Sequence, residues 1–595
     1  MAFQDFEYIS ERRRAEKQRK LKKRIAMGTV SAFALVALIA VAIFVGVSKS
    51  SDTDTKSAQP HQQATNEDSH RHSNKVIKMI CNSTDYKEMC ENTLSKAVQA
   101  KPELGNTRDL LKTAISATAD EVNMAMNKSM GFRFNTPAEK AAFEDCQVLM
   151  QDAKDELGFS VFLVGNSDVG KLPSETPDLN NWLSAVMSYQ QTCIDGFPQG
   201  KLKDGMENAL KAVKELTSNS LAIVSEVAWF LSTFQETAGP SRRLLEKESN
   251  SPNSLDKDGY PTWMAREDRR MLKANDEKPT PNVIVAKDGS GDYKTISGAF
   301  ASVPEKYQGR YVIYVKEGIY EETVTVTNKM VNVTLYGDGS QKSIITGSKN
   351  FVDGVRTFET ATFVALGEGF LAKGMGFRNT AGPEKGQAVA ARVQADGAVF
   401  VNCRFEGYQD TLYAQTHRQF YRSCVVAGTI DFIFGDAAAV FQNCLIVVRK
   451  PLENQKNVVT AQGRVDKRET TGIVLHNCRI LPDEKLVPLK SKIKSYLGRP
   501  CKEYSRTVVM ESTIDDVIHP DGWLPWEGNF ALNTLYYAEF NNNGPGATVV
   551  SRVNWPGRKV IDKQEALNYT VGPFLHAEDW INATDVQVHF GLYTS

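Results

Sequence analysis

The sequence lacks the signatures of the commonest hydrolases and group-transfer enzymes. It has no Gly-X-Ser-X-Gly motif, no Cys/His group with the spacing of a zinc site, and no glycine-rich loop that ends in Lys-Ser or Lys-Thr. Histidine is scarce in the central strand-forming region, where only His417 and His476 occur. These absences argue against serine catalysis, metal-dependent hydrolysis and phosphoryl transfer.

The chain also lacks a net charge, with 71 Lys and Arg against 71 Asp and Glu in 595 residues. A balanced charge gives no reason to expect a nucleic-acid partner. Charge is nevertheless uneven, because nine Lys or Arg stand against two Glu between residues 11 and 24. We therefore interpret residues 1–24 as a basic N-terminal segment.

An uncharged run of 23 residues, 25–47, follows the basic segment. A run of this length spans a bilayer as a helix, and the basic residues before it predict a cytosolic N-terminus. We favour a signal anchor over a cleaved signal peptide, whose apolar core is shorter and closer to the N-terminus. The rest of the chain is then expected in the secretory lumen or outside the cell, attached to the membrane through residues 25–47.

Nine cysteines agree with an oxidising compartment. The chain also contains Asn-X-Ser/Thr triplets, each of which is a weak signal for glycosylation. The asparagines of these triplets are Asn82, Asn127, Asn332, Asn568 and Asn582.

Helical periodicity follows a polar segment, 48–74, which we interpret as a stalk. From 75 to 234, apolar residues recur at steps of three and four, which predicts an all-α four-helix bundle. Its four cysteines allow three pairings. Pairing Cys81 with Cys90 would join an N-terminal hairpin, and Cys146 with Cys193 would then join two helices of the bundle.

A polar, charged segment rich in Pro, Gly and Ser, 235–280, is predicted to be a linker. It contains Arg242-Arg243-Leu244-Leu245 and, later, Arg269-Arg270-Met271-Leu272. Dibasic pairs in an exposed secretory linker are candidate processing sites. The alternative is a linker that is merely charged, and the similarity of the two tetrads favours processing.

Short strands replace helices from residue 281 to 595, and they recur every 20 to 30 residues between Gly, Asn and Asp turns. The dipeptide Asn-Cys appears at 402–403, 443–444 and 477–478, each time beside an apolar run. Recurrence of one small unit indicates stacked rungs. We predict a mainly β fold, a right-handed parallel β-helix, with a β-sandwich as the alternative.

Two carboxylates, Asp410 and Asp431, stand 21 positions apart among apolar, strand-forming residues. A buried carboxylate is costly unless it is paired or functional, although either Asp alone could simply cap a turn. Gln387, Gln409 and Arg499 are the polar residues that could act with them. Two Asp can divide the work of attack and proton donation if their surroundings separate their pKa values.

The segment from 281 onward resembles the plant pectinesterases (pectin methylesterases), and the helical segment resembles the inhibitor-like pro-region of that family. The Arg242 tetrad is similar to the family's maturation site, which implies a subtilisin-like processing protease. The resemblance in the C-terminal segment spans some 300 residues in order. It is carried by Asp288-Gly289-Ser290-Gly291-Asp292-Tyr293, Gly318-Ile319-Tyr320-Glu321-Glu322, Gly386-Gln387-Ala388-Val389-Ala390, Gln409-Asp410-Thr411-Leu412-Tyr413, Asp431-Phe432-Ile433-Phe434-Gly435 and Leu497-Gly498-Arg499-Pro500.

The resemblance implies hydrolysis of the methyl esters of homogalacturonan in the cell wall, without a metal or organic cofactor. It implies that Asp431 is the nucleophile and Asp410 the acid and base. Gln387 and Gln409 would stabilise the oxyanion, and Arg499 would orient Asp431 and keep it ionised.

The resemblance also implies further contacts. Thr357 matches a substrate-contacting position, and Cys424 with Cys444 matches a disulfide of the family. A proteinaceous pectinesterase inhibitor is a further implied partner. We also expect sugar-facing aromatic residues, although aromatic residues of a β-helix equally serve packing. These candidates are Tyr413, Phe432, Trp523 and Trp526.

One position departs from the family pattern, because Cys501 stands where Trp usually follows Leu-Gly-Arg-Pro. We expect weaker or altered substrate binding at this position rather than lost chemistry, since both Asp and both Gln are kept.

Three hypotheses remain. The first is an esterase zymogen whose helical bundle restrains the enzyme until the linker is cut. The second is a non-catalytic wall-binding protein, against which the set of Asp410, Asp431 and Arg499 argues. The third is another β-helix pectin enzyme. A glycosidase needs carboxylates across a glycosidic bond, and a lyase needs a calcium-binding Asp cluster with a basic residue, and the sequence shows neither grouping.

Overall fold

The computed structural model describes residues 66–101, 104, 106–235, 279–582, 584 and 586–593. The predicted basic segment, the span 25–47, most of the stalk and both linker tetrads lie outside these residues. We call residues 66–235 the helical half and residues 279–593 the strand half. Among the described helices, none is long and apolar enough to cross a membrane.

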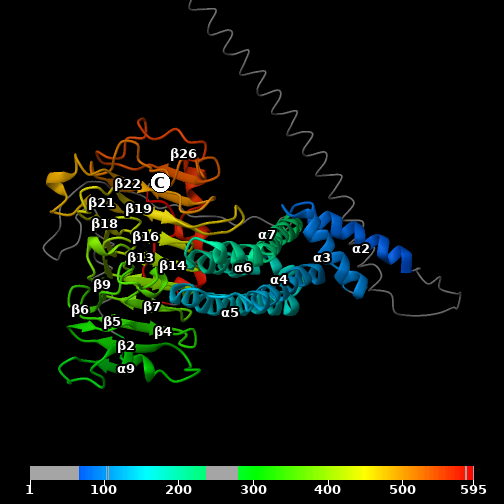
Figure 1. The fold of residues 1–595 in the computed structure, drawn as a ribbon, viewed down its shortest axis with the longest axis horizontal. Helices are drawn as coiled ribbons and strands as arrows, with labels where there is room; N and C mark the ends of the chain where they lie inside the picture. Colours follow the sequence, from blue (N-terminus) through cyan, green and yellow to red (C-terminus); the bar gives the residue numbers. More distant parts are fainter. Residues whose placement is uncertain are drawn as a thin grey trace, which may run out of the picture. The chain divides into compact units, whose positions relative to one another are not determined.

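The helical half consists of long helices, of which α4 to α7 pack on one another around an apolar core (Figure 1). Thr136 begins α5 with a capping box, in which Thr136 and Glu139 satisfy each other's backbone N–H groups. The first helix begins at Asn66, so the predicted stalk 48–74 ends earlier than expected. The helices are α2 (Asn66–Cys81), α3 (Lys87–Ala100), α4 (Thr107–Ser129), α5 (Pro137–Asn166), η2 (Val169–Lys171), α6 (Leu172–Gly196) and α7 (Lys201–Gln235).

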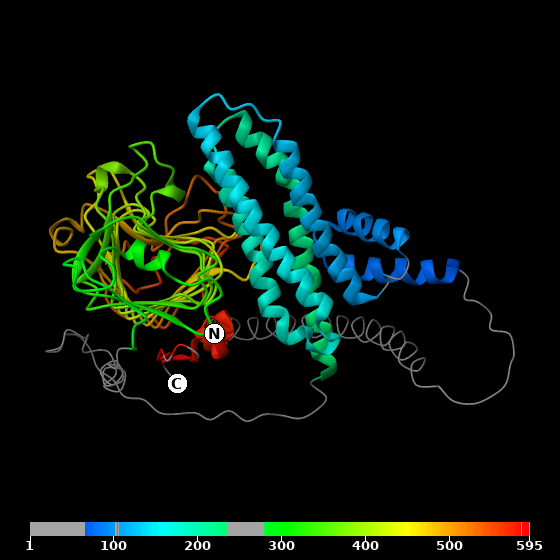
Figure 2. The same cartoon turned by 90° about the horizontal axis from the view of Figure 1, so that it is seen from below.

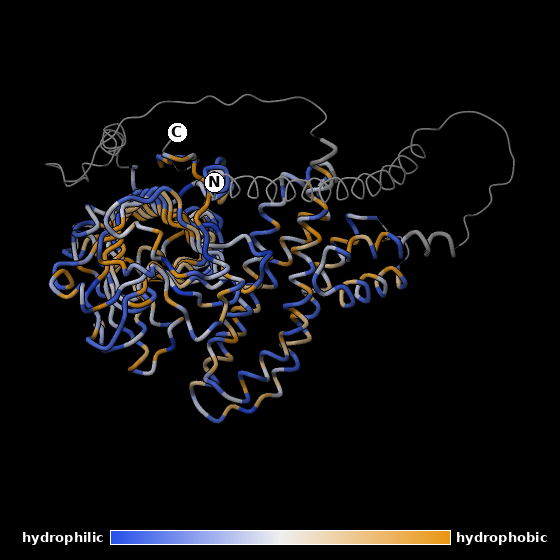
Figure 3. The backbone as a smooth tube through the Cα atoms, turned by 90° about the horizontal axis from the view of Figure 1, so that it is seen from above, coloured by the Kyte–Doolittle hydropathy of each residue, from blue (hydrophilic) through white to orange (hydrophobic). Residues whose placement is uncertain are grey.

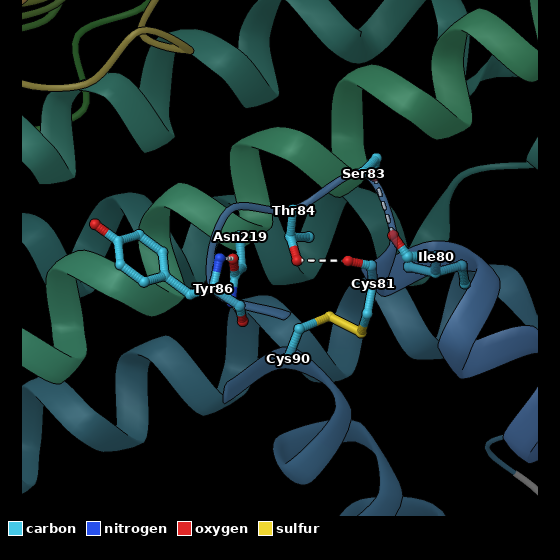
Figure 4. The surroundings of a disulfide bond; sticks show 7 residues. All are labelled: Ile80, Cys81, Ser83, Thr84, Tyr86, Cys90 and Asn219. Atoms are coloured by element: carbon cyan, nitrogen blue, oxygen red, sulfur yellow. Dashed lines mark hydrogen bonds between the residues drawn. A yellow bond between two sulfur atoms is a disulfide. The ribbon is translucent and has the colours of Figure 1, made fainter. Parts of the chain in front are cut away.

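Two disulfides cross-link the helical half, and both pairings were predicted from the sequence. Cys81–Cys90 closes the turn between α2 and α3, and Cys146–Cys193 joins α5 to α6. Figure 4 shows the first of these, with Thr84 Oγ1 donating to the Cys81 carbonyl over 2.7 Å. Asn219 of α7 holds the same turn by hydrogen bonds to the backbone N–H and carbonyl of Tyr86.

The strand half is built from three parallel sheets, so the prediction of a parallel β-helix is confirmed and the β-sandwich alternative is wrong. A complete rung contributes one strand to each sheet, the rungs at the two ends are incomplete, and every pairing between the named strands of the described part is parallel. Figure 2 shows the successive rungs superposed when the coil is seen end-on.

Neighbouring strands of each sheet belong to successive rungs, so the order in space follows the order along the chain. The first sheet contains β1 (Val283–Val285), β2 (Tyr311–Val315), β5 (Val333–Gly337), β8 (Leu371–Lys373), β11 (Ala398–Val401), β14 (Arg418–Arg422), β17 (Ala438–Gln442), β20 (Gly472–His476), β23 (Arg506–Met510), β25 (Tyr536–Phe540) and β26 (Arg558–Val560). The second contains β22 (Ser495–Gly498), β19 (Asn457–Gln462), β16 (Ile433–Gly435), β13 (Leu412–Ala414), β10 (Ala391–Val393), β7 (Phe363–Ala365) and β4 (Val324–Val326). The third contains β24 (Thr513–Ile514), β21 (Arg479–Pro482), β18 (Leu445–Val448), β15 (Val425–Gly428), β12 (Arg404–Glu406), β9 (Gly376–Asn379), β6 (Ser343–Gly347) and β3 (Gly318–Glu321).

Short helices lie between and after the strands. They are α9 (Ile296–Ala301), η3 (Thr357–Glu359), η4 (Pro383–Lys385), η5 (Val487–Leu489), α10 (Lys563–Leu567), α11 (Val571–Leu575) and α12 (Glu578–Asn582).

Equivalent side chains of successive rungs stack inside the coil and form its core. Phe400, Tyr421 and Phe441 lie one above another, with ring centroids 5.0 and 4.3 Å apart. Figure 3 shows the apolar residues gathered on the inner side of the rungs. Because each rung repeats the same environment, the sequence repeats the same residue types at the same place.

The Asn-Cys repeat is one of these stacks. Asn402, Asn443 and Asn477 turn the chain with a positive φ, and Ser423 does the same before Cys424. Asn477 donates to the Asn443 side chain over 2.9 Å, which links two rungs. The recurring unit is therefore a left-handed turn residue followed by an inward-facing cysteine.

The disulfide expected between Cys424 and Cys444 is not formed, because both residues are free, buried thiols. The two residues are neighbours in the stack, where the Cys424 N–H donates to the Cys444 sulfur over 3.4 Å. Cys424 Sγ lies 3.3 Å from the Phe400 carbonyl, and Cys444 Sγ lies 3.4 Å from the Tyr421 carbonyl. Each thiol is thus satisfied by the rung before it.

Candidate active site

The predicted site residues converge on the sheet that contains β10, β13, β16, β19 and β22. Asp410 lies just before β13 and Asp431 just before β16, on adjacent rungs, where the Asp410 N–H donates to the Ile430 carbonyl over 3.0 Å. Gln409, on the rung of Asp410, is paired in a parallel bridge with Gln387 of the preceding rung. Arg499 follows β22 directly. Residues far apart in sequence thus meet because the coil stacks their rungs.

Both carboxylates are held in an uncommon backbone conformation. Asp410 has φ 61° and Asp431 has φ 50°, in the left-handed region that few side chains other than Asn and Asp tolerate. Such conformations cost of order 1–3 kcal/mol and cluster at functional sites. Asp410 is 8% exposed and Asp431 is 5% exposed.

Arg499 holds Asp431 by a bidentate ion pair. Its Nε donates to Oδ1 over 2.8 Å and its Nη2 to Oδ2 over 2.5 Å. The guanidinium also lies over the ring of Trp526, with Cζ 4.3 Å from the centroid. Arg499 is therefore fixed on two sides, and it presents Asp431 in one orientation.

The surroundings separate the pKa values of the two carboxyl groups. Burial and the negative charge of Asp431 raise the pKa of Asp410 well above its ordinary value, and Arg499 opposes this only in part. Burial also raises the pKa of Asp431, but two hydrogen bonds and the charge of Arg499 limit the rise. Asp431 is consequently the stronger acid, so an ionised Asp431 can coexist with a protonated Asp410.

Cys501 is half-buried beside the two carboxylates. Burial, together with the charges of Asp195 and Asp431, raises the pKa of its thiol to about 12, although Lys502 acts in the opposite direction. The thiol is therefore neutral at neutral pH, and a neutral thiol is a weak nucleophile.

The structure divides the predicted aromatic residues into two groups. Phe432 and Trp523 are fully buried in the coil, so the prediction that they face a sugar is wrong. Tyr413 stacks on Phe434, with centroids 4.3 Å apart, and Trp526 is 40% exposed. Tyr413 and Trp526 are the two that remain available at the surface of the site.

Side chains from the helical half cover the candidate site. Thr192 Oγ1 of α6 lies 3.3 Å from the Tyr413 hydroxyl, and Asp195 of α6 forms an ion pair with Lys502 at 2.7 Å. Thr357 belongs to η3, and the preceding residue, Arg356, forms a bidentate pair with a carboxylate of α5. The C-terminal end of α6 thus contacts Tyr413 and Lys502 at the candidate site.

The contacts continue along the same sheet, away from the catalytic pair. Gln394 donates to Asp152 over 2.8 Å, and Ser188 donates to the Gln415 carbonyl over 3.0 Å. Further along, a cavity of about 1630 Å³ lies between α5, α6 and the strand half, and its lining includes His417 but neither Asp410 nor Asp431.

The five predicted glycosylation sites have exposed asparagines, so the prediction stays open. Sequence reasoning missed the support that Trp526 gives to Arg499 and all contacts between the two halves. The contact residues carry no motif, and more than 200 positions separate partners such as Asp145 and Arg356.

Comparison with known proteins identifies the family of the chain. The Pectinesterase family model matches residues 282–578, and the Plant invertase/pectin methylesterase inhibitor model matches residues 75–223. An Arabidopsis thaliana protein that carries the name pectinesterase/pectinesterase inhibitor 45 is 50% identical, and the match covers 100% of both chains. Pectinesterase 3 of Citrus sinensis is 42% identical over 87% of this chain and 88% of its own. The solved pectin methylesterase from carrot is 52% identical, with a TM-score of 0.53, over 53% of this chain and 99% of its own.

The two matches indicate an inhibitor-type helical domain followed along the chain by a pectinesterase domain. The chain belongs to the family of plant pectinesterase/pectinesterase inhibitor proteins, with the inhibitor domain N-terminal and the pectinesterase domain C-terminal. The solved carrot chain corresponds in extent to the strand half.

Proposed function

We propose that the strand half hydrolyses methyl esters of homogalacturonan to free carboxylates and methanol, with Asp431 as the nucleophile. The observation that carries this proposal is the bidentate clamp of Arg499 on Asp431 beside a carboxyl group with a much higher pKa. Asp431 attacks the ester carbonyl, and Gln387 and Gln409 stabilise the oxyanion that forms.

Asp410 supplies the proton in the next step. The tetrahedral intermediate expels methoxide, which takes the proton of Asp410 and leaves as methanol, while Asp431 stays bound to the acyl group as an anhydride. Asp410, now ionised, removes a proton from water, and the resulting hydroxide attacks the acyl carbon. This releases the carboxylic acid of the galacturonate unit, which loses its proton to solvent, and it regenerates ionised Asp431 and protonated Asp410.

The helical half restrains this activity in the intact chain. Support comes from Thr192 and Asp195, which contact Tyr413 and Lys502 at the candidate site. A polymer that enters the site has to displace these contacts. Cleavage at Arg242-Arg243-Leu244-Leu245 by a subtilisin-like protease, and release of the helical half, would relieve the restraint.

The proposed setting is the cell wall, reached through the secretory pathway, with the precursor anchored by residues 25–47. The two disulfides and the exposed asparagines of the five sequons agree with that setting. Localising a tagged full-length chain, with and without residues 25–47, tests this part by itself.

Methanol release from methyl-esterified pectin tests the proposed activity. The assay compares the intact chain with the chain cut in the linker, each as wild type and as Asp431→Asn. Asp516→Asn is the matched control, because Asp516 is an exposed carboxylate paired with Lys490. We expect activity that rises on cutting, disappears in Asp431→Asn and persists in Asp516→Asn. Equal activity of wild type and Asp431→Asn would refute the nucleophile, and binding of pectin without methanol release would favour a wall-binding protein.

A further inference from the structure

The ion pairs between the two halves all have the same arrangement of charge. In each such pair within the described residues, the helical half supplies the carboxylate and the strand half supplies the cation. The pairs are Asp145 with Arg356, Glu156 with His417, Asp178 with Arg418, Asp85 with Lys467 and Arg468, and Asp195 with Lys502. We call Arg356, Arg418, Lys467, Arg468 and Lys502 the basic rim of the strand half.

The basic rim is contacted through geometry that suits carboxylates. Arg356 binds both oxygens of Asp145, at 2.5 and 2.8 Å, which is the fork arrangement that guanidinium and carboxylate groups prefer. Arg418 binds Asp178 over 2.8 Å and also forms a bidentate pair with Asp396 of its own half. Arg468 pairs with Asp85 and also donates to the Ser83 carbonyl over 2.9 Å, next to the disulfide of Figure 4.

The basic rim is too long for a small anion. Asp178 and Asp195, which pair with Arg418 and Lys502, lie on one helix, α6, and 17 residues of helix span about 25 Å. A series of cations spread over this distance matches a polymer that carries a carboxylate on many of its units. One end of the series, at Lys502, adjoins Cys501 and the catalytic carboxylates.

We propose that the basic rim binds the free carboxylates of de-esterified homogalacturonan, and that the helical half covers it by presenting carboxylates in their place. The identity of the polymer rests on the proposed function. The proposed reaction turns a neutral ester polymer into a polyanion, so cations beside the site hold segments that have already been converted. The contacts of the helical half thereby block the catalytic pair and the polymer track together.

The experiment measures binding of polygalacturonate by calorimetry, with fully methyl-esterified pectin as the comparison. Wild-type chain is used intact and after linker cleavage with removal of the helical half, and circular dichroism checks that the freed strand half, which corresponds in extent to the solved carrot chain, stays folded. The rim variant is Lys467→Gln/Arg468→Gln/Lys502→Gln. The control is Lys485→Gln/Lys563→Gln, which removes two exposed cations outside the basic rim.

We expect the freed strand half to bind polygalacturonate more tightly than esterified pectin, and added salt to weaken this binding. The rim variant should bind about tenfold more weakly, since exposed ion pairs contribute modestly and three are removed. The control should bind as wild type does, and the intact chain should bind less than the freed strand half.

Equal binding by wild type and rim variant, or binding that salt does not weaken, would overturn the proposal. So would an intact chain that binds as tightly as the freed strand half. If circular dichroism shows that the rim variant is unfolded, Lys467→Gln/Arg468→Gln replaces it, because the Lys467 side chain is 51% exposed in the intact chain. Methanol release without polygalacturonate binding rejects this inference alone. Rim-dependent binding without methanol release rejects the proposed function alone.

Discussion

Two disulfides cross-link the helical half, whereas the five cysteines described in the strand half are all free. Helices are fixed to one another only by side-chain packing, so a covalent link between α5 and α6 restricts the unfolded chain and stabilises that packing. In the strand half, each rung is hydrogen-bonded to the next along its whole length. The candidate active site therefore lies in the half that is held rigid by hydrogen bonds between backbone strands.

The largest expected effect is a difference in stability between the two halves when cysteines are replaced. Cys146→Ala/Cys193→Ala opens a link between residues 47 positions apart, which should lower the free energy of unfolding of the helical half by about 4 kcal/mol. Cys424→Ala is the matched change in the strand half, and it should cost about 1 kcal/mol, because it removes a thiol and no cross-link. Thermal unfolding of the full chain should show one early transition in the first variant. A strand half that melts as early as the helical half would contradict the comparison.

The next effect is confined to the strand half. Arg499→Ala removes a preorganised charged group and should lower kcat about 10²-fold. Because Arg499 opposes the rise of the Asp431 pKa, its loss raises that pKa further, and the acidic limb of kcat against pH moves to higher pH. Arg499→Lys keeps the charge without the bidentate geometry and should show a smaller shift. The profile is measured by methanol release from the linker-cut chain. An unmoved acidic limb in Arg499→Ala would show that Arg499 does not set the charge of Asp431.

A smaller effect tests the contact between the halves. Asp145→Ala/Asp195→Ala removes two ion pairs to the basic rim. If these pairs contribute about 1.4 kcal/mol to the free energy of association between the two halves, their loss should raise the activity of the intact chain about tenfold. The linker-cut, bundle-free chain should be unaffected. Asp120→Ala, an exposed carboxylate of α4, is the control. If the activity of the intact chain does not rise, these ion pairs do not contribute to the restraint.

The smallest effect concerns pH. His417 faces Glu156 and Tyr189 of the helical half and Asp396 and Arg418 of its own half. Burial lowers the pKa of His417, but Glu156 and Asp396 outweigh burial, so the pKa lies above its ordinary value. The ion pair with Glu156 therefore contributes fully below the ordinary pKa and is lost as pH rises through the raised one.

The intact chain should accordingly become less restrained as pH rises, by about two- to threefold relative to the freed strand half. His417→Gln should remove this difference, measured as the ratio of methanol release by the two forms across pH. A ratio that changes with pH equally in His417→Gln would assign the effect to other groups.

Repetition and motif made the strand half predictable from sequence. The Asn-Cys repeat predicted stacked rungs, and the two Asp with Arg499 predicted a site that the coil does bring together. The burial of single side chains was harder to predict from the sequence. Phe432 and Trp523 are aromatic residues near motif residues, and only the geometry of the coil shows that they belong to its core. The disulfide expected at Cys424 is also absent, because spacing along the chain does not reveal that each of the two thiols contacts a backbone carbonyl of the preceding rung instead.

The helical half was predictable in class and in its cross-links, but its contacts were not. A carboxylate on a helix, such as Asp178 or Asp195, is usually a solvated residue, and nothing local distinguishes one that meets a cation 200 or more positions away. Helix α2 also begins inside a polar segment whose composition is typical of a stalk. Long-range pairing is therefore what the structure adds.

The left-handed backbone of Asp410 and Asp431 has a consequence for how the two positions tolerate substitution. The same conformation occurs at Asn402, Asn443 and Asn477, where a short amide side chain stands at a turn of the coil. Asp410 and Asp431 thus have a backbone conformation that asparagine also adopts in this fold. Exchange of carboxylate for amide at either position should therefore remove a charge without straining the backbone.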